Sequence, residues 1–111
     1  MGEKLKVFVS STYTDLIEEH QAATQAILDA GHIPISIEFF RAGKSQLKEI
    51  YRLIEKSDLF ILILGGYYGY VEKESGLSFT ELEYRYAINK DIFIYPLILS
   101  DNFLLKKLLM T

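Results

Sequence analysis

The residues best suited to chemistry lie in a short stretch near the end of the sequence, residues 78–87. Its pattern predicts a helix, on which residues three or four apart are neighbours, so Glu83 shares a largely apolar face with Phe79. Glu81 lies about 200° away around the helix, beside Arg85, where a surface salt bridge is available. A partly buried carboxylate needs a hydrogen-bond partner, and beside a ligand it can stabilise a developing positive charge. Glu83 is therefore the candidate catalytic residue, with a solvated or salt-bridged glutamate as the alternative interpretation.

A second group of polar residues follows the first apolar run of the sequence. Ser10, Ser11 and Thr12 come directly after this run and just ahead of a predicted helix. Hydroxyl and backbone N–H groups at a helix N-terminus favour anions such as phosphate. The alternative is that these residues only cap the helix, a role in which serine and threonine are preferred. We predict that all three bind a ligand.

Candidate ligand-binding residues also follow the second and third apolar runs. Glu38 and Arg41 come after the second run, and Gly65, Gly66 and Tyr67 come after the third. Two glycines allow a ligand to approach the backbone closely, although a tight turn without a ligand uses the same residues. A tyrosine ring is suited to stacking on a base, with ordinary packing as its alternative. The sequence has neither the glycine pattern of dinucleotide-binding proteins nor the lysine of a phosphate-binding loop.

The elements that must position these residues alternate regularly along the chain. Apolar runs typical of strands end near Val9, Ile37, Leu64 and Leu99, and helical stripes lie between them. Ser45 and Ser78 are the predicted caps of the second and third helices. This alternation predicts an α/β protein, with a parallel sheet and helices on both of its faces. In such sheets ligands bind beyond the carboxyl ends of the strands, where all the candidate residues above are expected to meet.

Composition restricts the classes of function. The chain has 111 residues, a formal charge of −3, two histidines and no cysteine. One domain is expected at this length, over residues 1–100, with residues 101–111 beginning a further helix or the truncated remainder of a longer protein. The lack of cysteine excludes disulfides and thiolate metal sites, and we expect no metal site. The acidic balance argues against nucleic acid as a partner. With no targeting segment or membrane span in the pattern, a cytoplasmic protein is expected.

Together these motifs resemble the TIR-like family known as domain of unknown function 4062. The resemblance runs from about Lys6 to Leu99, and the segments that carry it are Val7-Phe8-Val9-Ser10-Ser11-Thr12, Gly31-His32-Ile33-Pro34, Leu64-Gly65-Gly66-Tyr67-Tyr68-Gly69 and Ser78-Phe79-Thr80-Glu81-Leu82-Glu83. The family is similar to Toll/interleukin-receptor domains and to nucleoside deoxyribosyltransferases. The resemblance implies a flavodoxin-like three-layer sandwich with a parallel sheet of four or five strands, in the order 2-1-3-4.

The resemblance also bears on the site. Catalytic relatives carry a glutamate on the helix after strand three, with alanine four residues later, and Glu83 with Ala87 fits that spacing. Thr80 stands where catalytic TIR domains have cysteine, which is a departure from their pattern. By this resemblance Ser10 and Ser11 would hold phosphate or ribose, and Tyr67 or Phe39 would flank the base.

Three functions remain open at this stage. The first is a TIR-like signalling or effector domain that binds a nucleotide such as NAD⁺ and cleaves its N-glycosidic bond, with NAD⁺ as substrate rather than cofactor. The second is a non-catalytic interaction module that docks other domains of a longer chain or a second copy, since one well-placed glutamate serves either function. The third is an enzyme similar to nucleoside deoxyribosyltransferases. Some members of the family occur in proteins that resemble antiphage defence systems.

Overall fold

Four parallel strands form one sheet in the computed structural model, which describes residues 3–12, 16–35, 44–66, 68–69 and 71–100. The strands are β1 (Lys6–Ser11), β2 (Ile33–Ile35), β3 (Leu59–Leu64) and β4 (Phe93–Ile98). Their order is β2-β1-β3-β4, which confirms the predicted flavodoxin-like order. β2 pairs with one edge of β1 and β3 pairs with the other, while β4 pairs with β3. β1 and β3 are therefore the central strands of the described sheet.

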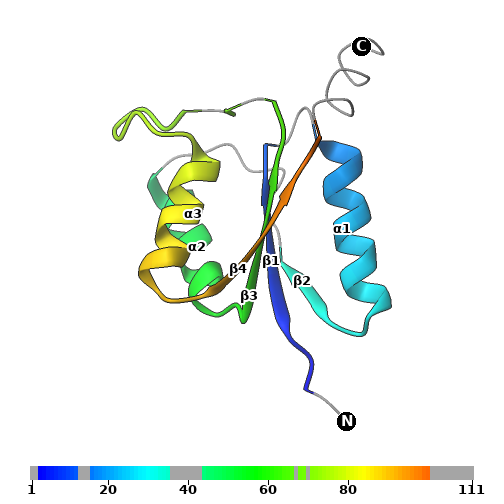
Figure 1. The fold of residues 1–111 in the computed structure, drawn as a ribbon. Coiled ribbons are helices and arrows are strands. Elements are labelled where there is room, and N and C mark those ends of the chain that lie inside the picture. The colour runs from blue at the N-terminus through cyan, green and yellow to red at the C-terminus, as the bar shows by residue number, and fades with distance from the viewer. Residues whose placement is uncertain (1–2, 13–15, 36–43, 67, 70, 101–111) are drawn as a thin grey trace.

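Three helices cover the two faces of the sheet. α1 (Ile17–Asp29) lies on one face, and α2 (Lys44–Glu55) and α3 (Phe79–Asn89) lie together on the other (Figure 1). α1 ends beside Gly31, whose φ of 86° is readily adopted only by glycine. α3 begins after Ser78, whose hydroxyl accepts a hydrogen bond from the backbone N–H of Glu81, as predicted. α2 begins at Lys44, so Ser45 lies inside the helix rather than at its predicted cap position.

Side chains of β1 alternate between two separate hydrophobic cores, because successive residues of a strand point to opposite faces of the sheet. Val7 and Val9 pack with Leu16 and Ile27 on the α1 face. Phe8 stacks on Phe60 and packs on the other face, beneath α2 and α3. The same alternation decides on which face each polar residue at the end of β1 lies.

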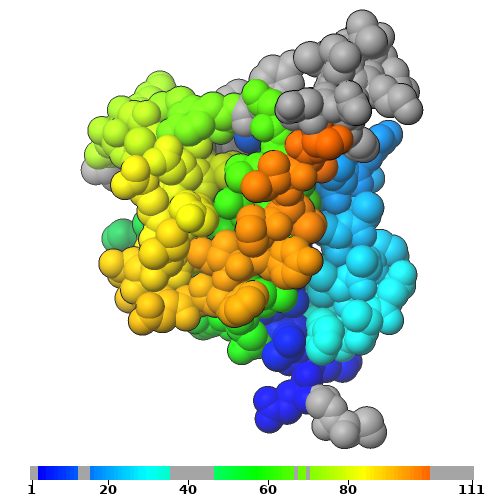
Figure 2. Space-filling view, in the orientation of Figure 1, coloured from blue at the N-terminus to red at the C-terminus, as the bar shows by residue number. Residues whose placement is uncertain are grey.

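The two edge strands each contain a proline, which fits the rule that proline cannot donate to a central ladder. Pro34 lies in β2, where it pairs with Val7, and Pro96 lies in β4. β4 is open to the surface between α3 and α1 (Figure 2), with Phe93 68% exposed and Ile98 73% exposed. A continuous apolar run such as that of β4 is typical of a strand buried on both faces. The exposure of these side chains is therefore larger than the sequence predicts.

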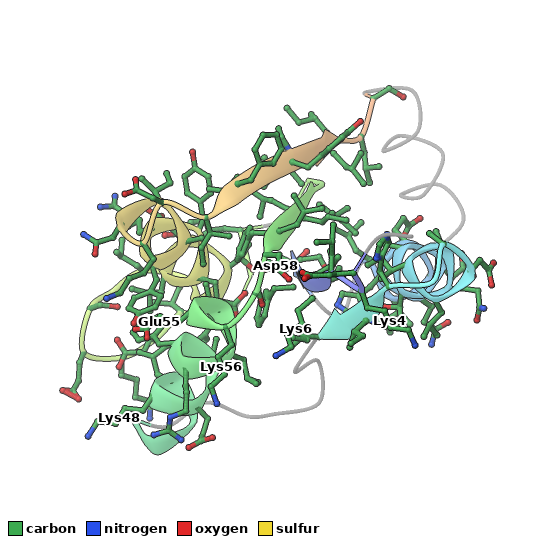
Figure 3. The ribbon with its side chains drawn as sticks, turned by 90° about the horizontal axis from the view of Figure 1, so that it is seen from below. Lys4, Lys6, Lys48, Glu55, Lys56 and Asp58 are labelled. Atoms are coloured by element: carbon green, nitrogen blue, oxygen red, sulfur yellow. The ribbon has the colours of Figure 1, made fainter. Side chains whose placement is uncertain are left out.

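Charged side chains gather at the amino ends of the strands, away from the carboxyl edge (Figure 3). Asp58 precedes β3 and accepts a hydrogen bond from the backbone N–H of Lys6 at 2.8 Å. Asp58 thereby ties β3 to β1 at this end of the sheet.

In the described ranges, no helix has both the length and the hydropathy that a membrane crossing requires. The predicted division at residue 100 concerns residues 101–111, which lie outside the described residues.

Candidate functional site

Glu83 and Ser10 meet at the carboxyl end of β1. The Ser10 hydroxyl donates a hydrogen bond of 2.6 Å to Glu83 Oε1. Ser10 is 2% exposed and follows Phe8 on the face that α3 covers. Glu83 lies on α3, one helical turn before the fully buried Ala87, so its side chain faces the sheet. A buried serine and an inward glutamate, 73 residues apart in the sequence, thus form one hydrogen-bonded pair.

Burial raises the pKa of the Glu83 carboxyl group to about 7, although the hydrogen bond from Ser10 opposes this rise. The cause is the loss of water around the charged form, which a single hydroxyl only partly replaces. Tyr51 on α2 lies within electrostatic reach. Burial raises the pKa of Tyr51, and the charges of Glu83 and Glu72 raise it further. At neutral pH the Glu83 carboxyl group therefore exchanges readily between its protonated and ionised forms.

Ser11 is separated from this pair by the pleat of β1. The prediction placed Ser10 and Ser11 side by side on one ligand, but consecutive strand residues face opposite ways. Ser11 belongs to the face of Val9 and α1, where its hydroxyl oxygen is buried with no hydrogen-bond partner among the described residues. The structure therefore places Ser10, but not Ser11, with Glu83.

Thr12 lies against the segment that joins β3 to α3. A Cβ atom at Gly69 would lie 2.8 Å from Thr12 Cγ2 and 3.9 Å from Thr80 Oγ1. Gly69 also has a φ of 95°, a conformation that residues with a side chain rarely adopt. Glycine is thus required at position 69, where three segments converge beside the Ser10–Glu83 pair.

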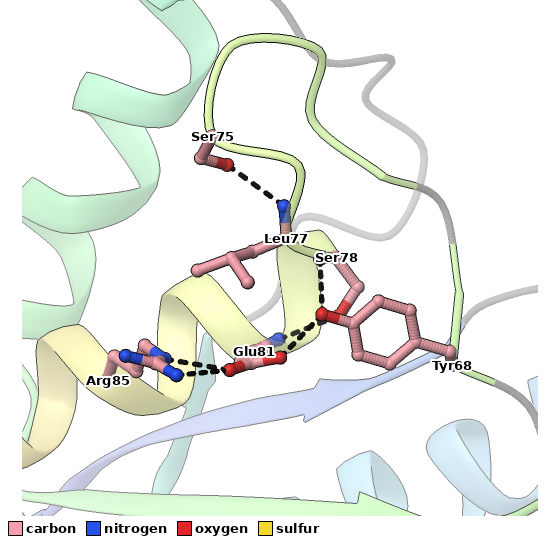
Figure 4. Close-up of polar contacts among 6 residues, drawn as sticks. All are labelled: Tyr68, Ser75, Leu77, Ser78, Glu81 and Arg85. Carbon is pink, nitrogen blue, oxygen red and sulfur yellow. Dashed lines mark hydrogen bonds and ion pairs between the residues drawn. The ribbon is translucent and has the colours of Figure 1, made fainter.

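Polar contacts attach the same connecting segment to the first turns of α3 (Figure 4). The Tyr68 hydroxyl accepts from the Ser78 backbone N–H at 3.1 Å and donates to Glu81 Oε1. Arg85 binds the other oxygen of Glu81 at 2.8 and 2.7 Å. The expected surface salt bridge between Glu81 and Arg85 is therefore present, and these contacts keep Glu81 apart from Glu83.

The remaining predicted residues fall into three groups. Gly65 is half-buried and Gly66 is exposed just after β3, and a Cβ at Gly66 would meet nothing within 4 Å. Phe79 is half-buried as the first residue of α3. The others lie outside the described residues, and they are Glu38, Phe39, Arg41 and Tyr67.

Three residues of this region, Tyr51, Tyr68 and Gly69, are not among the ligand-binding or catalytic residues that the sequence predicts. Gly69 had a weak signal, because a glycine in a connecting segment marks a turn and readily adopts a positive φ. The closeness of Tyr51 had none, since it depends on how α2 packs beside α3.

Among the described residues the arrangement offers one carboxyl group with a pKa near neutrality, that of Glu83, and a hydroxyl group that orients it. Such a carboxyl group can accept or deliver a proton at neutral pH, and its ionised form can stabilise a nearby positive charge. Its place at the carboxyl edge of a parallel sheet is where ligands of such folds bind.

Comparison with known proteins agrees with this architecture. The model of the family described as "Domain of unknown function (DUF4062)" matches residues 6–109. Among solved structures, the chain is similar to the CMP N-glycosidase BcmB of Clostridium botulinum, with 20% sequence identity and a TM-score of 0.57. That match covers 95% of this chain and 81% of the glycosidase. No curated protein matches the sequence.

Proposed function

The chain belongs to the DUF4062 family, and from this premise we propose that it is a TIR-like domain that cleaves the N-glycosidic bond of a nucleotide. The observation that carries the proposal is the 2.6 Å hydrogen bond between Ser10 and the carboxyl group of the half-buried, inward-facing Glu83. The structural similarity to a CMP N-glycosidase supports this reaction class. NAD⁺ is the first candidate substrate and CMP is the second.

In the proposed reaction the bond between C1′ of the ribose and the base nitrogen breaks, and the electron pair leaves with the base. The sugar then carries positive charge shared between C1′ and the ring oxygen. Ionised Glu83 stabilises this charge, a contribution that is strong in a site that excludes water. Water adds to C1′ and gives its proton to the Glu83 carboxylate, which the raised pKa makes an effective acceptor near neutral pH.

The leaving group decides what else the reaction requires. Nicotinamide leaves NAD⁺ as a neutral molecule and needs no proton. Cytosine leaves CMP as an anion unless it is protonated, and the protonated form of Glu83 can donate that proton. The hydroxyl of Ser10 keeps the carboxyl group in one orientation in both cases.

The test measures release of free base from NAD⁺ and, separately, from CMP. The full chain is compared with Glu83→Gln, which keeps the side-chain shape but removes the titratable group. We expect a loss of about 10²–10⁴-fold in rate. Glu49→Gln is the matched control, because Glu49 is an exposed residue of α2 that pairs with Arg52 at 2.6 Å. Release that is equal in wild type and Glu83→Gln would refute the assignment. Adding a second free base distinguishes transfer, as in nucleoside deoxyribosyltransferases, from hydrolysis.

A second candidate function, a non-catalytic interaction module, is favoured by the exposed apolar residues of β4, of which Phe93 and Ile98 are the most exposed. Under this function, Phe93→Lys abolishes association with a second copy or another domain, whereas Glu83→Gln leaves it intact. Sedimentation of both variants measures association with a second copy. Base release that depends on Glu83 would favour the enzyme instead.

A further inference from the structure

The Tyr68 hydroxyl links the segment after β3 to the first turn of α3, in addition to the backbone bridge between Val71 and Ser78. It accepts a hydrogen bond from the first free N–H at the start of α3, that of Ser78, and it donates one to the Glu81 carboxylate. Arg85 holds that carboxylate from the other side. Hydrogen bonds to a charged group are roughly twice as strong as neutral ones, so this arrangement is more than a loose surface contact.

The neighbour of Tyr68 in the chain is the glycine that lies against the site. Gly69 approaches Thr12, which directly follows β1 and lies two residues after Ser10, and Thr80, three residues before Glu83 on α3. Residues two apart in a strand share a face, and residues three apart on a helix are neighbours. Thr12 and Thr80 are therefore next to Ser10 and Glu83, on the side from which Gly69 approaches.

We propose that Tyr68 is a positioning residue whose hydroxyl fixes the segment after β3 to the outer side of α3 and so holds Gly69 beside the Ser10–Glu83 pair. The inference rests on the proposed function, because that pair is its reactive group. Gly69 held in this place excludes water from the pair, and dehydration is what sets the protonation behaviour of Glu83.

The chemistry of Glu81 suits this role. Hydrogen bonds from Tyr68 and Arg85 lower the pKa of the Glu81 carboxyl group, so it remains an ionised acceptor throughout the neutral range. Two carboxylates on the same helix thus behave oppositely, since burial raises the pKa of Glu83. Glu81 serves the fixing contact and Glu83 the reaction.

The first test uses nuclear magnetic resonance on the full chain and needs no substrate. One readout is the Overhauser contact between the Gly69 Hα atoms and the Thr12 methyl group. The other is the pKa of Glu83, measured from its carboxyl carbon, with Tyr51 and Glu72 left unchanged because the charges of Glu83 and Glu72 both act on Tyr51. The variants are Tyr68→Phe and Glu81→Ala, each of which removes one member of the Tyr68–Glu81 hydrogen bond.

We expect both variants to lose the Gly69–Thr12 contact and to lower the pKa of Glu83 by at least about one unit toward its ordinary value. Glu81→Gln keeps an oxygen that accepts from Tyr68 and should retain both signals. Tyr84→Phe is the matched control, because Tyr84 lies on the exposed side of α3. Unchanged contact and pKa in Tyr68→Phe would overturn the inference.

Activity is measured separately, so that the two proposals fail in different ways. Wild type that releases no base, while Tyr68→Phe loses the contact and shifts the pKa, refutes the proposed function and supports the positioning role. Wild type that releases base, with the Gly69–Thr12 contact intact in Tyr68→Phe, supports the function and overturns the positioning role. If both hold, Tyr68→Phe moves the midpoint of the pH profile of base release to lower pH, whereas Tyr84→Phe does not.

Discussion

The behaviour of Glu83 is decided by its surroundings rather than by its residue type. Glu81, two positions earlier, has hydrogen-bonding partners that lower the pKa of its carboxyl group, whereas burial raises the pKa of Glu83 to about 7. The only hydrogen bond described for the Glu83 side chain comes from Ser10. This difference separates a structural carboxylate from a reactive one on a single helix.

The raised pKa of Glu83 predicts that stability depends on pH. The folded state binds this proton more tightly than the unfolded state, in which the pKa returns to about 4.5. Its contribution is therefore fully present below pH 4.5 and is lost as pH rises through about 7. We expect Glu83→Gln to be more stable than wild type at pH 8, by up to about 3 kcal/mol, and not at pH 4.

Urea unfolding of both proteins at the two pH values measures this difference. A stability gap that is equal at pH 4 and pH 8 would contradict the assigned pKa.

At the scale of single residues, the sequence is enough to assign Glu83 and Glu81 to different faces of the helix, because helical spacing alone determines this. It could not find the partner of Glu83 among two adjacent serines, since Ser10 and Ser11 differ only in which face of β1 they occupy. That choice depends on the register of β1 beneath α3, which is a tertiary property.

The segment between β3 and α3 is the element on which the geometry of the site depends most. It continues from Gly69 into an antiparallel bridge between Val71 and Ser78, and the Glu72 N–H donates to the Leu77 carbonyl at 2.8 Å. The segment therefore folds back on itself before α3 begins. At Gly69 the segment approaches Thr12, the residue that follows β1.

This approach predicts different outcomes for two glycines of the segment. Gly69→Ala should lower the free energy of unfolding by about 1–3 kcal/mol, because it adds both a clash with Thr12 and a strained φ. Gly66→Ala is the control, since a Cβ there meets nothing within 4 Å. Its free energy of unfolding should be unchanged or raised by up to about 1 kcal/mol.

Combining Gly69→Ala with Thr12→Ser, which removes the clashing methyl group, should recover part of the loss. Equal stability of the two alanine variants in urea would show that Gly69 does not approach β1 as described.

Elements were predictable where a local pattern determines them. The four strands, the three helices and the Ser78 cap all follow from periodicity and capping residues. The approach of Gly69 to Thr12 joins residues 57 positions apart, for which no local pattern exists. Gly65 and Gly66 were predicted to bind a ligand because they directly follow a strand, whereas the tight contact with Thr12 is made by Gly69.

The described part of the molecule has two hydrophobic cores and an exposed apolar edge strand, β4. Phe60 is fully buried beneath α2 and α3, whereas Phe93 on β4 is 68% exposed. The strand order was predicted from the resemblance to the DUF4062 family and is confirmed. The exposure of β4 was not predicted, because its apolar run looks like that of a strand covered on both faces.

This contrast predicts unequal costs for the same substitution. Phe60→Ala should lower the free energy of unfolding by about 3–5 kcal/mol, because it leaves a cavity in a packed core. Phe93→Ala should change it by no more than about 0.5 kcal/mol, since little burial is lost. Urea unfolding of the monomer at low protein concentration measures both values. A large loss in Phe93→Ala would show that β4 is covered in solution.

The pH dependence of base release tests most directly whether the Ser10–Glu83 pair is a glycosidic reaction centre. In wild type the rate of release from NAD⁺ or CMP should follow one group with an apparent pKa near 7. Ser10→Ala removes the hydrogen bond that lowers the pKa of Glu83, so its profile should move to higher pH, and Glu83→Gln should release almost no base. Release that is independent of pH near 7, or that persists in Glu83→Gln, would contradict the proposed reaction.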